Sequence, residues 1–440
     1  MIGQIIFTLL LLAGGGYFWS NISKAIRNIK LGKPAHRDDR KDERLRNMLL
    51  KSFGQQKMFK RPIPALLHLT VYLGFIIINI EVLEIIIDGV FGTHRVFAPM
   101  GAFYNFLIGS FEFLAILVIV AVIIFWIRRN ILKLLRFNQP EMKGWPKKDA
   151  NIILYFEMVL MSAFLTMNAA DYKLQTLHYG HYFFKEGIVG GFPISHYLYN
   201  ILPNNPETLV MIERGAWWFH IIGILVFLNY LYFSKHLHIL LAFPNTYYAK
   251  LPPLAKIENL ESVKKEVALM MDPNADPYAA PADDAEEPER FGAKDIFDLQ
   301  WVYLLNAYTC TECGRCTDVC PANQTGKKLS PRKIMMDVRD RVEEVGKNID
   351  KNGEFIDDGK SLLDYISKEE LWACTTCNAC VEECPVENDP MDIIVSVRQY
   401  LVMEESAAPS ELNMMFTNIE NNGAPWQYSQ MDRLNWVDED

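Results

Sequence analysis

All eight cysteines of this 440-residue chain fall into two short runs with the same spacing. Each run reads C-x2-C-x2-C-x3-C-P. The two runs consist of Cys310, Cys313, Cys316, Cys320 and Pro321, and of Cys374, Cys377, Cys380, Cys384 and Pro385. This is the bacterial-type spacing for thiolate ligands of 4Fe–4S clusters, which carry one electron at a time. The spacing therefore predicts two clusters and electron-transfer chemistry.

In such paired runs the first three thiolates hold one cluster, and the fourth reaches across to the other. We therefore predict two crossed ligand sets, one made of Cys310, Cys313, Cys316 and Cys384, and the other of Cys374, Cys377, Cys380 and Cys320. A zinc site is the first alternative, but it leaves the third cysteine of each run and both prolines unexplained. Disulfides are the second alternative, and they require an oxidising compartment.

The chain that positions these runs divides into an apolar half and an acidic half. Apolar residues concentrate before residue 245 and acidic residues after 255, and the net charge is -9. Five apolar stretches, at about 2–19, 63–87, 104–127, 150–169 and 210–236, are long enough to cross roughly 30 Å of hydrocarbon. The first could be read as a signal peptide, but its start is uncharged and basic residues follow it. We predict a retained transmembrane helix.

Two connections between these stretches are strongly basic, namely residues 20–62 and 128–148. The positive-inside rule places such loops in the cytoplasm. Five spans with the N-terminus outside then put the cysteine half in the reducing cytoplasm. We therefore expect a multi-pass protein of the bacterial inner (cytoplasmic) membrane. The composition offers no basic arm or aromatic-interleaved patch for nucleic acid.

The predicted fold class is all-α, with a five-helix transmembrane bundle followed by a mostly helical two-cluster ferredoxin domain. The expected division is residues 1–248 for the bundle, 249–292 for an acidic Pro/Ala linker, 293–402 for the ferredoxin domain and 403–440 for a polar tail. Within the ferredoxin domain we expect helices at 293–307, 331–345 and 361–372. Turn-forming residues at 350–359 predict a small hairpin. The tail is either disordered or docks on a partner.

The chain has nine histidines, and three of them are candidate cofactor ligands. His220 and His238 lie 18 residues apart in one apolar stretch, which is five helical turns and about 27 Å, so both should face the same way. His68 lies about two turns inside the second span, at the depth of His238. Histidines from two helices can hold a haem iron from both sides, so we predict haem b between His68 and His238. We interpret His236, which faces elsewhere, as an interface residue beside Lys235.

The segment Phe-Ser-Lys-His-Leu-His-Ile at 233–239, with Pro244 and Tyr247, resembles the end of the last helix in the membrane subunit of respiratory nitrate reductase. That family has five spans and a His-x17-His pair at this place. The resemblance implies a cytochrome b bundle, with His238 as a ligand of the inner haem and His220 as a ligand of an outer haem.

Other segments resemble related families. Arg61, His68 and Gly74-Phe75 resemble the second-span motif of the same subunit and of the membrane subunit of heterodisulfide reductase. The paired cysteine runs resemble the helical ferredoxin subunit of heterodisulfide reductase, and residues 418–436 resemble a segment of that wider family. Together these resemblances imply a natural fusion of a cytochrome b anchor with a two-cluster ferredoxin.

The chain departs from the nitrate reductase pattern at one position. A second histidine is expected ten residues after His68, where it would bind the outer haem opposite His220, but this chain has Ile78 followed by Asn79. Isoleucine cannot bind iron. A second haem then needs another ligand from the outer histidines, which are His94, His178, His181 and His196.

Acidic residues inside membrane spans are costly and are functional candidates by default. Glu81 and Glu84 lie in the outer part of the second span, Glu112 in the third and Glu157 in the fourth. A carboxylate beside a quinol ring can accept a released proton. The alternative for each residue is a helix-end or interhelical hydrogen bond.

We expect a membrane electron-transfer subunit that connects a quinone pool, with menaquinol as the expected quinol, through haem b and two 4Fe–4S clusters to a soluble partner in a hetero-oligomeric complex. The chain has no Rossmann G-x-G-x-x-G and no evident flavin site, so any substrate chemistry belongs to another polypeptide, an iron–sulfur or flavin oxidoreductase subunit of heterodisulfide reductase type. One alternative is a haem-free anchor that tethers a ferredoxin to a larger membrane complex. Another is part of an ion-coupled redox pump that uses the intramembrane carboxylates.

Overall fold

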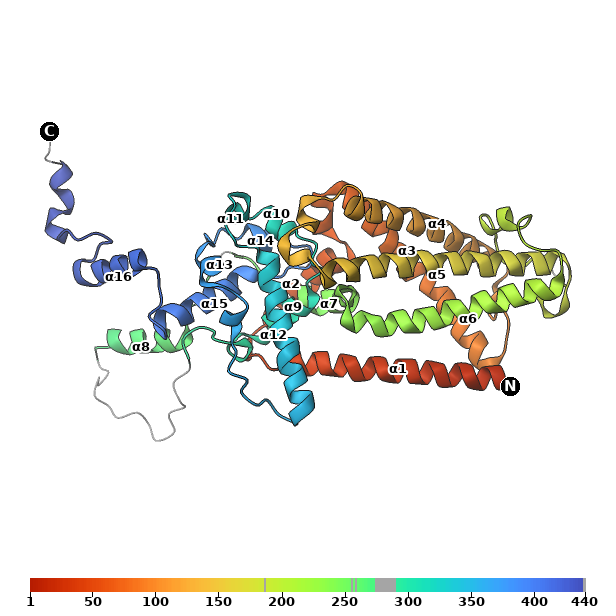
Figure 1. Cartoon of the computed structure of the whole chain (residues 1–440), viewed down its shortest axis with the longest axis horizontal. Coiled ribbons are helices and arrows are strands. Elements are labelled where there is room, and N and C mark those ends of the chain that lie inside the picture. The colour runs from red at the N-terminus through yellow and green to blue at the C-terminus, as the bar shows by residue number, and fades with distance from the viewer. Residues whose placement is uncertain (186, 255, 258, 274–289, 438–440) are drawn as a thin grey trace.

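The computed structural model describes residues 1–440 except 186, 255, 258, 274–289 and 438–440. The described residues form helices and loops without a strand, and their one β-bridge is an isolated parallel pair that joins Lys33 to Gln300. The prediction of an all-α fold is confirmed. In Figure 1 the molecule is elongated, with a helical bundle at one end, a compact helical region beside it and the C-terminal segment beyond.

The five predicted spans are five long apolar helices: α1 (Ile2–Ile29), α3 (Pro62–Phe91), α4 (Ala102–Asn130), α5 (Trp145–Thr176) and α6 (Pro206–Tyr230). Each begins at or before the predicted start. Successive helices run in opposite directions, and α1 begins at the end of the bundle far from the cysteine runs (Figure 1). Both basic connections therefore lie at the end that contacts the cysteine half.

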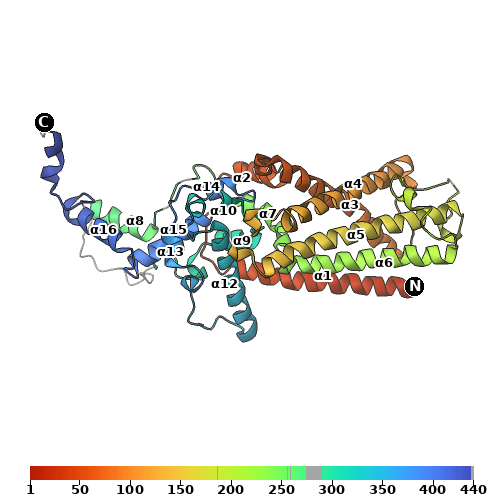
Figure 2. The same ribbon diagram turned by 45° about the horizontal axis from the view of Figure 1, so that its top comes forward.

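The surface of the bundle is suited to lipid. In α1 only 6% of the most apolar window is buried, and Ile2, Ile5, Leu9 and Leu12 are exposed. The interior core joins α3, α4, α5 and α6 through residues such as Ile108, Phe111 and Phe164. Figure 2 shows α5 and α6 side by side along much of their length. Helices that are apolar all round belong in a membrane, so the chain is a multi-pass membrane protein.

The cysteine half is built on three main helices, α9 (Trp301–Thr309), α12 (Pro331–Asn352) and α15 (Pro390–Met403). The Ser330 side chain caps α12 by accepting the Lys333 N–H, and Gly353 ends the helix with a φ of +86°. The helix predicted at 331–345 is confirmed and extends further. Four short helices carry the cysteines or flank them: α10 (Arg315–Asp318), α11 (Pro321–Gln324), α13 (Lys368–Trp372) and α14 (Ala379–Glu383).

Two other predictions for this half were too simple. The prediction of a hairpin at 350–359 is wrong, because residues 350–352 continue α12. The loop that follows is closed by the Asn348 side-chain amide, which bonds to the backbone C=O and N–H of Ile356 at 2.8 and 3.0 Å. The helices predicted at 293–307 and 361–372 are interrupted. Each segment starts with a single 3₁₀ turn closed by a capping box, and regular helix begins only at Trp301 and Lys368.

The linker and the tail both contain helix. Within residues 249–292 the chain forms α8 (Glu261–Met271), while 274–289 lie outside the described residues. The tail forms α16 (Ser410–Asn422) and a 3₁₀ segment, Gln430–Val437. In Figure 1 this tail extends away from the rest of the molecule. It leaves large apolar side chains exposed, including Tyr428, Met431 and Trp436.

The bundle and the cysteine half share one interface. Ala25 and Ile29 at the end of α1, and Leu237 after α6, belong to the same hydrophobic core as α9, α12 and α15. Ion pairs surround this contact, and most join a basic residue of the membrane half to an acidic residue of the cysteine half. They include Arg27–Asp350 at 2.5 Å, Lys57–Glu387 at 3.3 Å, Arg61–Asp318 at 2.6 Å and Arg61–Glu383 at 2.8 Å. The division at residue 248 stays a prediction.

One buried ion pair should dominate the stability of the cysteine half. The Arg341 side chain is fully buried and bonds to Asp295 and Asp358, each at 2.6 Å. Arg341→Met leaves both carboxylates without their cation, and breaking a buried pair this way costs about 3–5 kcal/mol. We expect a clearly lower midpoint of thermal unfolding by differential scanning calorimetry. The matched control is Lys328→Met, which removes an exposed pair with Glu369 worth about 0–1 kcal/mol; equal shifts for the two variants would contradict this account.

Candidate functional site

The two cysteine runs have the same local backbone design. In each run the residue two after the first cysteine has a positive φ, at Glu312 (+52°) and Thr376 (+53°). The residue four after the first cysteine is also left-handed and starts a short helix, at Gly314 (+72°) and Asn378 (+63°). A side chain at Gly314 would also meet the Arg332 guanidinium at 2.3 Å. These turns fold each run into a tight loop around its thiols.

The loops place the fourth cysteine of one run against the other run. Cys310, Cys313, Cys316 and Cys384 line one small cavity together with Pro385, and Cys380 of the second run also reaches its wall. Burial, together with the nearby Cys313 and Cys310, raises the pKa of Cys384 to about 12. Burial likewise raises the pKa of Cys374 and Cys380, and the neighbouring Cys320 adds to both shifts. This arrangement fits the crossed ligand sets, which stay a prediction.

All eight cysteines are free thiols. Within the described part of the chain, no three His, Cys, Asp or Glu side chains converge on a position for a single metal ion. Thiols of both runs instead line one cavity, which is bounded by the two cysteine loops. Backbone N–H groups already point at two sulfurs, from Thr376 to Cys374 at 3.4 Å and from Asn388 to Cys384 at 3.3 Å. Cluster sulfurs commonly receive such hydrogen bonds.

Cations compensate for the charge that deprotonated thiols bring. Burial raises the pKa of Cys310 to about 11, so the thiol must lose its proton for a metal to bind. Arg339 lies close enough to lower that pKa, and it is paired with Glu312 at 2.8 Å. Arg315 is buried beside Cys313 and donates to the backbone oxygens of Lys57 and Met58 at 3.2 and 3.4 Å. The first set therefore borders the bundle directly.

Two histidines of the bundle face each other beside this loop. The ring centroids of His68, in α3, and His238 are 6.3 Å apart. His68 Nδ1 contacts Gln55 Oε1 at 3.0 Å, and His238 Nδ1 contacts the Lys235 carbonyl at 3.0 Å. Both partners are hydrogen-bond acceptors, so each ring carries its proton on Nδ1 and has its lone pair on Nε2. A metal bound by two imidazoles at about 2 Å each separates their centroids by about 6 Å. The pair fits an iron with two axial histidines.

The sequence argument that linked His220 to His238 was wrong in its geometry. Regular helix α6 ends at Tyr230, Ser234 is extended, and a new helix, α7 (His238–Tyr247), begins at His238. The two histidines therefore do not share one face of a continuous helix. The break is held from another element, because Asp149 of α5 accepts the Tyr230 hydroxyl at 2.6 Å and the Lys235 N–H at 3.1 Å.

His236 also lies in this region, inside the protein. Its ring contacts His238 and Phe227, each at a centroid distance of 5.4 Å, and its Nε2 is 3.7 Å from Glu157. It was interpreted as an interface residue beside Lys235, whereas the structure places it next to the histidine pair.

His220 has no histidine opposite it. Its Nδ1 contacts the Leu160 carbonyl at 3.0 Å and its ring packs on Phe164. Among the described residues, no other histidine ring contacts His220. His94 packs on His181, His178 on Phe183 and His196 on Tyr197. The structure thus brings none of the four outer histidines to His220.

The intramembrane carboxylates fall into different classes. Glu84 accepts the Phe97 N–H at 2.9 Å and the Tyr104 hydroxyl at 2.8 Å. Glu112 accepts the backbone N–H groups of Ile194 and Ser195 at 2.9 and 3.0 Å, which anchors an outer loop. These two carboxylates have the hydrogen-bonding role of the alternative interpretation.

Sequence reasoning missed the residues that connect the cysteine loop to the histidines. Lys235 pairs with Glu312, which is adjacent to Cys313, while the Lys235 carbonyl contacts His238. Gln55 contacts His68 and belongs to the segment that Arg315 binds. The only signal for Lys235 was its position three residues before a candidate ligand. Gln55 gave none, because its role depends on contacts between distant segments.

Comparisons with known proteins agree with the cluster chemistry. Residues 309–388 match the family model described as a 4Fe-4S dicluster domain. The chain is 28% identical to the probable iron-sulfur-binding oxidoreductase FadF of Bacillus subtilis, over all of this chain and 61% of that protein. It is 27% identical to the EtfAB:quinone oxidoreductase of Syntrophomonas wolfei, over 92% of this chain and 55% of that protein. The chain thus spans less than two thirds of the length of either relative.

A third relative matches a smaller part of the chain. The chain is 31% identical to one subunit of the ferredoxin/F(420)H(2)-dependent CoB-CoM heterodisulfide reductase of Methanosarcina acetivorans, over 27% of this chain and 60% of that protein. No solved structure matches. The chain therefore has iron–sulfur oxidoreductases and heterodisulfide reductase subunits as homologues. The predicted 4Fe–4S chemistry is confirmed, while the nitrate reductase-like cytochrome b part stays a prediction.

The crossed ligand sets can be tested with two serine variants. Cys384→Ser should disturb the same cluster as Cys310→Ser, and Cys320→Ser the same cluster as Cys374→Ser, because the fourth thiol of each run faces the other run. We expect each single variant to lower the iron content from about eight to about four per chain. Electron paramagnetic resonance of the reduced protein should then show matching spectra within each pair. Matching spectra for Cys384→Ser and Cys374→Ser would instead assign each run to its own cluster.

Proposed function

We propose that this chain is a membrane-bound electron-transfer subunit that connects a membrane quinone pool, through haem b and two 4Fe–4S clusters, to a soluble oxidoreductase. The observation that carries the proposal is the contact between the first cysteine loop and the His68–His238 pair. Lys235 contacts His238 through its carbonyl and pairs with Glu312 of the loop. Gln55 contacts His68 and lies two residues before Lys57, whose carbonyl accepts from Arg315 of the loop. One-electron centres placed side by side in this way form a path along which single electrons can move.

Haem b, when bound between His68 and His238, would supply a one-electron centre inside the bundle. The residues of the chain orient that site. Gln55 and the Lys235 carbonyl each hold Nδ1 of one imidazole and leave its Nε2 available, and such partners set the ring orientation and the basicity of a ligating histidine. The single ligand His220 is the candidate for a second haem.

The orientation that we propose has the N-terminus outside and the cluster region in the cytoplasm of a bacterium. It is supported by the two basic connections, which both lie at the cluster end of the bundle. A reducing compartment also suits eight free thiols. The haem-free anchor explains the dicluster region equally well, but it gives no reason for the paired and oriented histidines.

The partner that we propose is a soluble iron–sulfur or flavin oxidoreductase. One relative is named an EtfAB:quinone oxidoreductase, and a donor of the EtfAB kind fits a chain without a flavin motif of its own. Electrons would pass at the second cysteine set, because Cys377 is the exposed cysteine. Menaquinone is the quinone that we propose, and the chemistry allows both directions.

Haem ligation by the histidine pair is tested by visible spectroscopy. We expect a dithionite-reduced minus oxidised spectrum of the purified chain to show a b-type α band, and we expect His68→Ala and His238→Ala each to abolish it. Iron bound by the cysteines should remain near eight per chain in both variants, which shows that they fold. His36→Ala, in an exposed part of the basic connection, should keep the band. A wild-type chain with full cluster iron and no band would favour the haem-free anchor.

The role of the tail is tested by deletion. Its exposed aromatic side chains are typical anchors of protein interfaces. Removing residues 407–440 should therefore slow reduction of the clusters by the soluble partner about tenfold or more, since loss of such anchors costs over 1 kcal/mol each. Reduction by dithionite should be unchanged. An unaltered rate with the partner would rule the tail out as the docking segment.

A further inference from the structure

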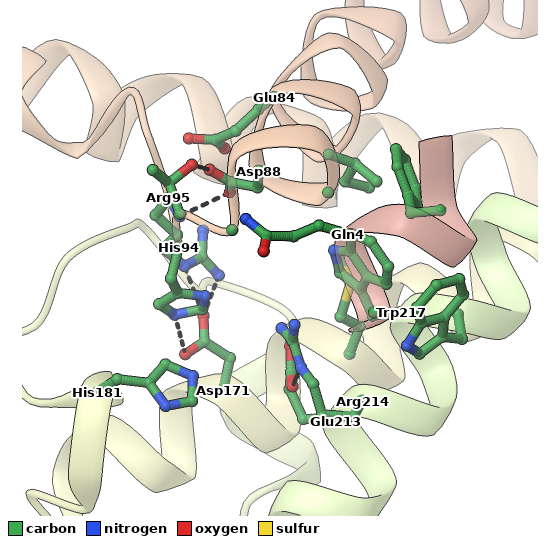
Figure 3. Close-up of a pocket in the computed structure, with 18 of the residues that line it drawn as sticks. Gln4, Glu84, Asp88, His94, Arg95, Asp171, His181, Glu213, Arg214 and Trp217 are labelled. Carbon is green, nitrogen blue, oxygen red and sulfur yellow. Dashed lines mark hydrogen bonds and ion pairs between the residues drawn. The ribbon is translucent and has the colours of Figure 1, made fainter. Parts of the chain in front are cut away.

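The bundle contains a cavity of about 480 Å³ at the end far from the cysteines. It lies where α1 and α6 begin and where α3 and α5 end (Figure 3). One wall is aromatic and consists of Phe7, Trp217 and Trp218. The facing wall is polar and carries Glu81 and His94 among other charged residues. A cavity of this size, with an aromatic wall and polar groups opposite it, is large enough for a small molecule.

Most of the charged groups in the polar wall are already paired within the protein. Arg95 bonds to Asp171 at 2.5 Å and to the Tyr104 hydroxyl at 2.9 Å. Arg214 pairs with its neighbour Glu213. These groups form a rigid frame and have little capacity left to bind a charged ligand, so the cavity is unsuited to a strong anion or cation.

Two groups in the wall have an atom without a hydrogen-bond partner in the described part of the chain, Glu81 Oε2 and His94 Nε2. The Glu81 side chain is buried, with 4% of the residue exposed. His94 Nε2 has Asp171 as its nearest charged neighbour, at 3.5 Å. A buried polar group left unpaired has lost its hydrogen bonds to water without replacing them, which is costly. A ligand with two hydrogen-bonding oxygens would recover that cost.

The cavity can be reached from the lipid. Gly3, Gln4 and Phe7 of α1 form part of its wall, and most of the apolar window of α1 is unburied. A ligand that enters past α1 would come from the bilayer with an apolar tail. The aromatic wall suits a flat ring, and the two free polar groups suit oxygens on that ring.

We propose that this cavity binds the head group of a membrane quinone, with Glu81 and His94 hydrogen-bonded to the ring oxygens. The inference rests on the proposed quinone-linked function and adds the site. The step is quinone + 2 e⁻ + 2 H⁺ → quinol, or its reverse. One proton passes through the Glu81 carboxyl group and one through the His94 imidazole. The electrons are exchanged singly with the one-electron centres of the chain.

The depth of the cavity in the bundle places His220 on the proposed electron path between the cavity and the His68–His238 pair. Glu81 follows His68 by 13 residues in α3, which is about 20 Å along the helix, whereas His220 is only three residues, or about 4.5 Å, deeper than Trp217 in α6. His220 thus lies between the cavity and the inner histidine pair. A second haem at His220 would lie between the quinone ring and the first.

Photoaffinity labelling locates the site without relying on turnover. The full chain in lipid nanodiscs would be irradiated with an azido analogue of menaquinone, digested and mapped by mass spectrometry. We expect label in peptides that contain residues 3–7, 81–95 or 213–218, removed by excess menaquinone. Label confined to the cluster end, for example near residues 55–68, would overturn this site while leaving the proposed function intact. No label together with no quinone reduction would overturn both.

Point variants separate binding from proton transfer. Trp217→Leu should weaken labelling about tenfold by removing the aromatic wall. Glu81→Gln keeps the volume of the side chain and should leave labelling unchanged, while reoxidation of dithionite-reduced clusters by a menaquinone analogue slows about 100-fold or more. Glu207→Gln, exposed at the start of α6, is the matched control and should behave as wild type. A Glu81→Gln variant with the wild-type rate would overturn the role of Glu81.

Discussion

The structure depends on an electrostatic contact between the first cysteine loop and the basic end of the helical bundle. This contact is formed by Glu312 of the loop. Glu312, between two cysteines, is buried and held by Lys235 and Arg339. The two cations lower the pKa of the Glu312 carboxyl below its usual value, despite a burial that would raise it. The loop is therefore charged where it meets the bundle, and losing either cation would leave an uncompensated buried charge. Because the Lys235 carbonyl also contacts His238, the same contact sets the spacing between the cysteine loop and the histidine pair.

This contact explains the uneven charge of the sequence. Basic residues in the connections at the cluster end pair with the acidic surface of the cysteine half. Lys57, Lys60 and Arg61 precede α3 and bond to residues around α10 and α14. The pairs of Lys60 and Arg61 are partly exposed and contribute little alone, whereas the Lys57–Glu387 pair is largely buried. As a set they fix the register of two regions that also share a hydrophobic core, so the clusters cannot move away from the bundle.

The sequence predicted what depends on local pattern and missed what depends on contacts between distant segments. The five spans and the cluster loops follow from hydrophobic length and cysteine spacing, which are local properties. The break after Tyr230 does not, because it is stabilised by Asp149 from another helix. For the same reason Gln55 could not be recognised as the partner of His68. The fit of His68 to His238 depends on depth in the membrane, which can be estimated from sequence, and on ring orientation, which cannot.

The intramembrane acids differ in whether the protein itself satisfies their hydrogen bonds. From hydrophobicity alone, the free-energy cost of placing an acidic side chain in the membrane is the same for Glu81, Glu84 and Glu112, since each lies in an apolar helix. In the fold, Glu84 and Glu112 receive N–H and O–H donors, so their cost is recovered within the protein. Glu81 faces a cavity with one oxygen unpaired. Evolutionary drift would readily replace such a residue by an apolar one of similar size if stability were its only contribution. A buried acid whose cost is not recovered by the fold is therefore best explained by a ligand that recovers it.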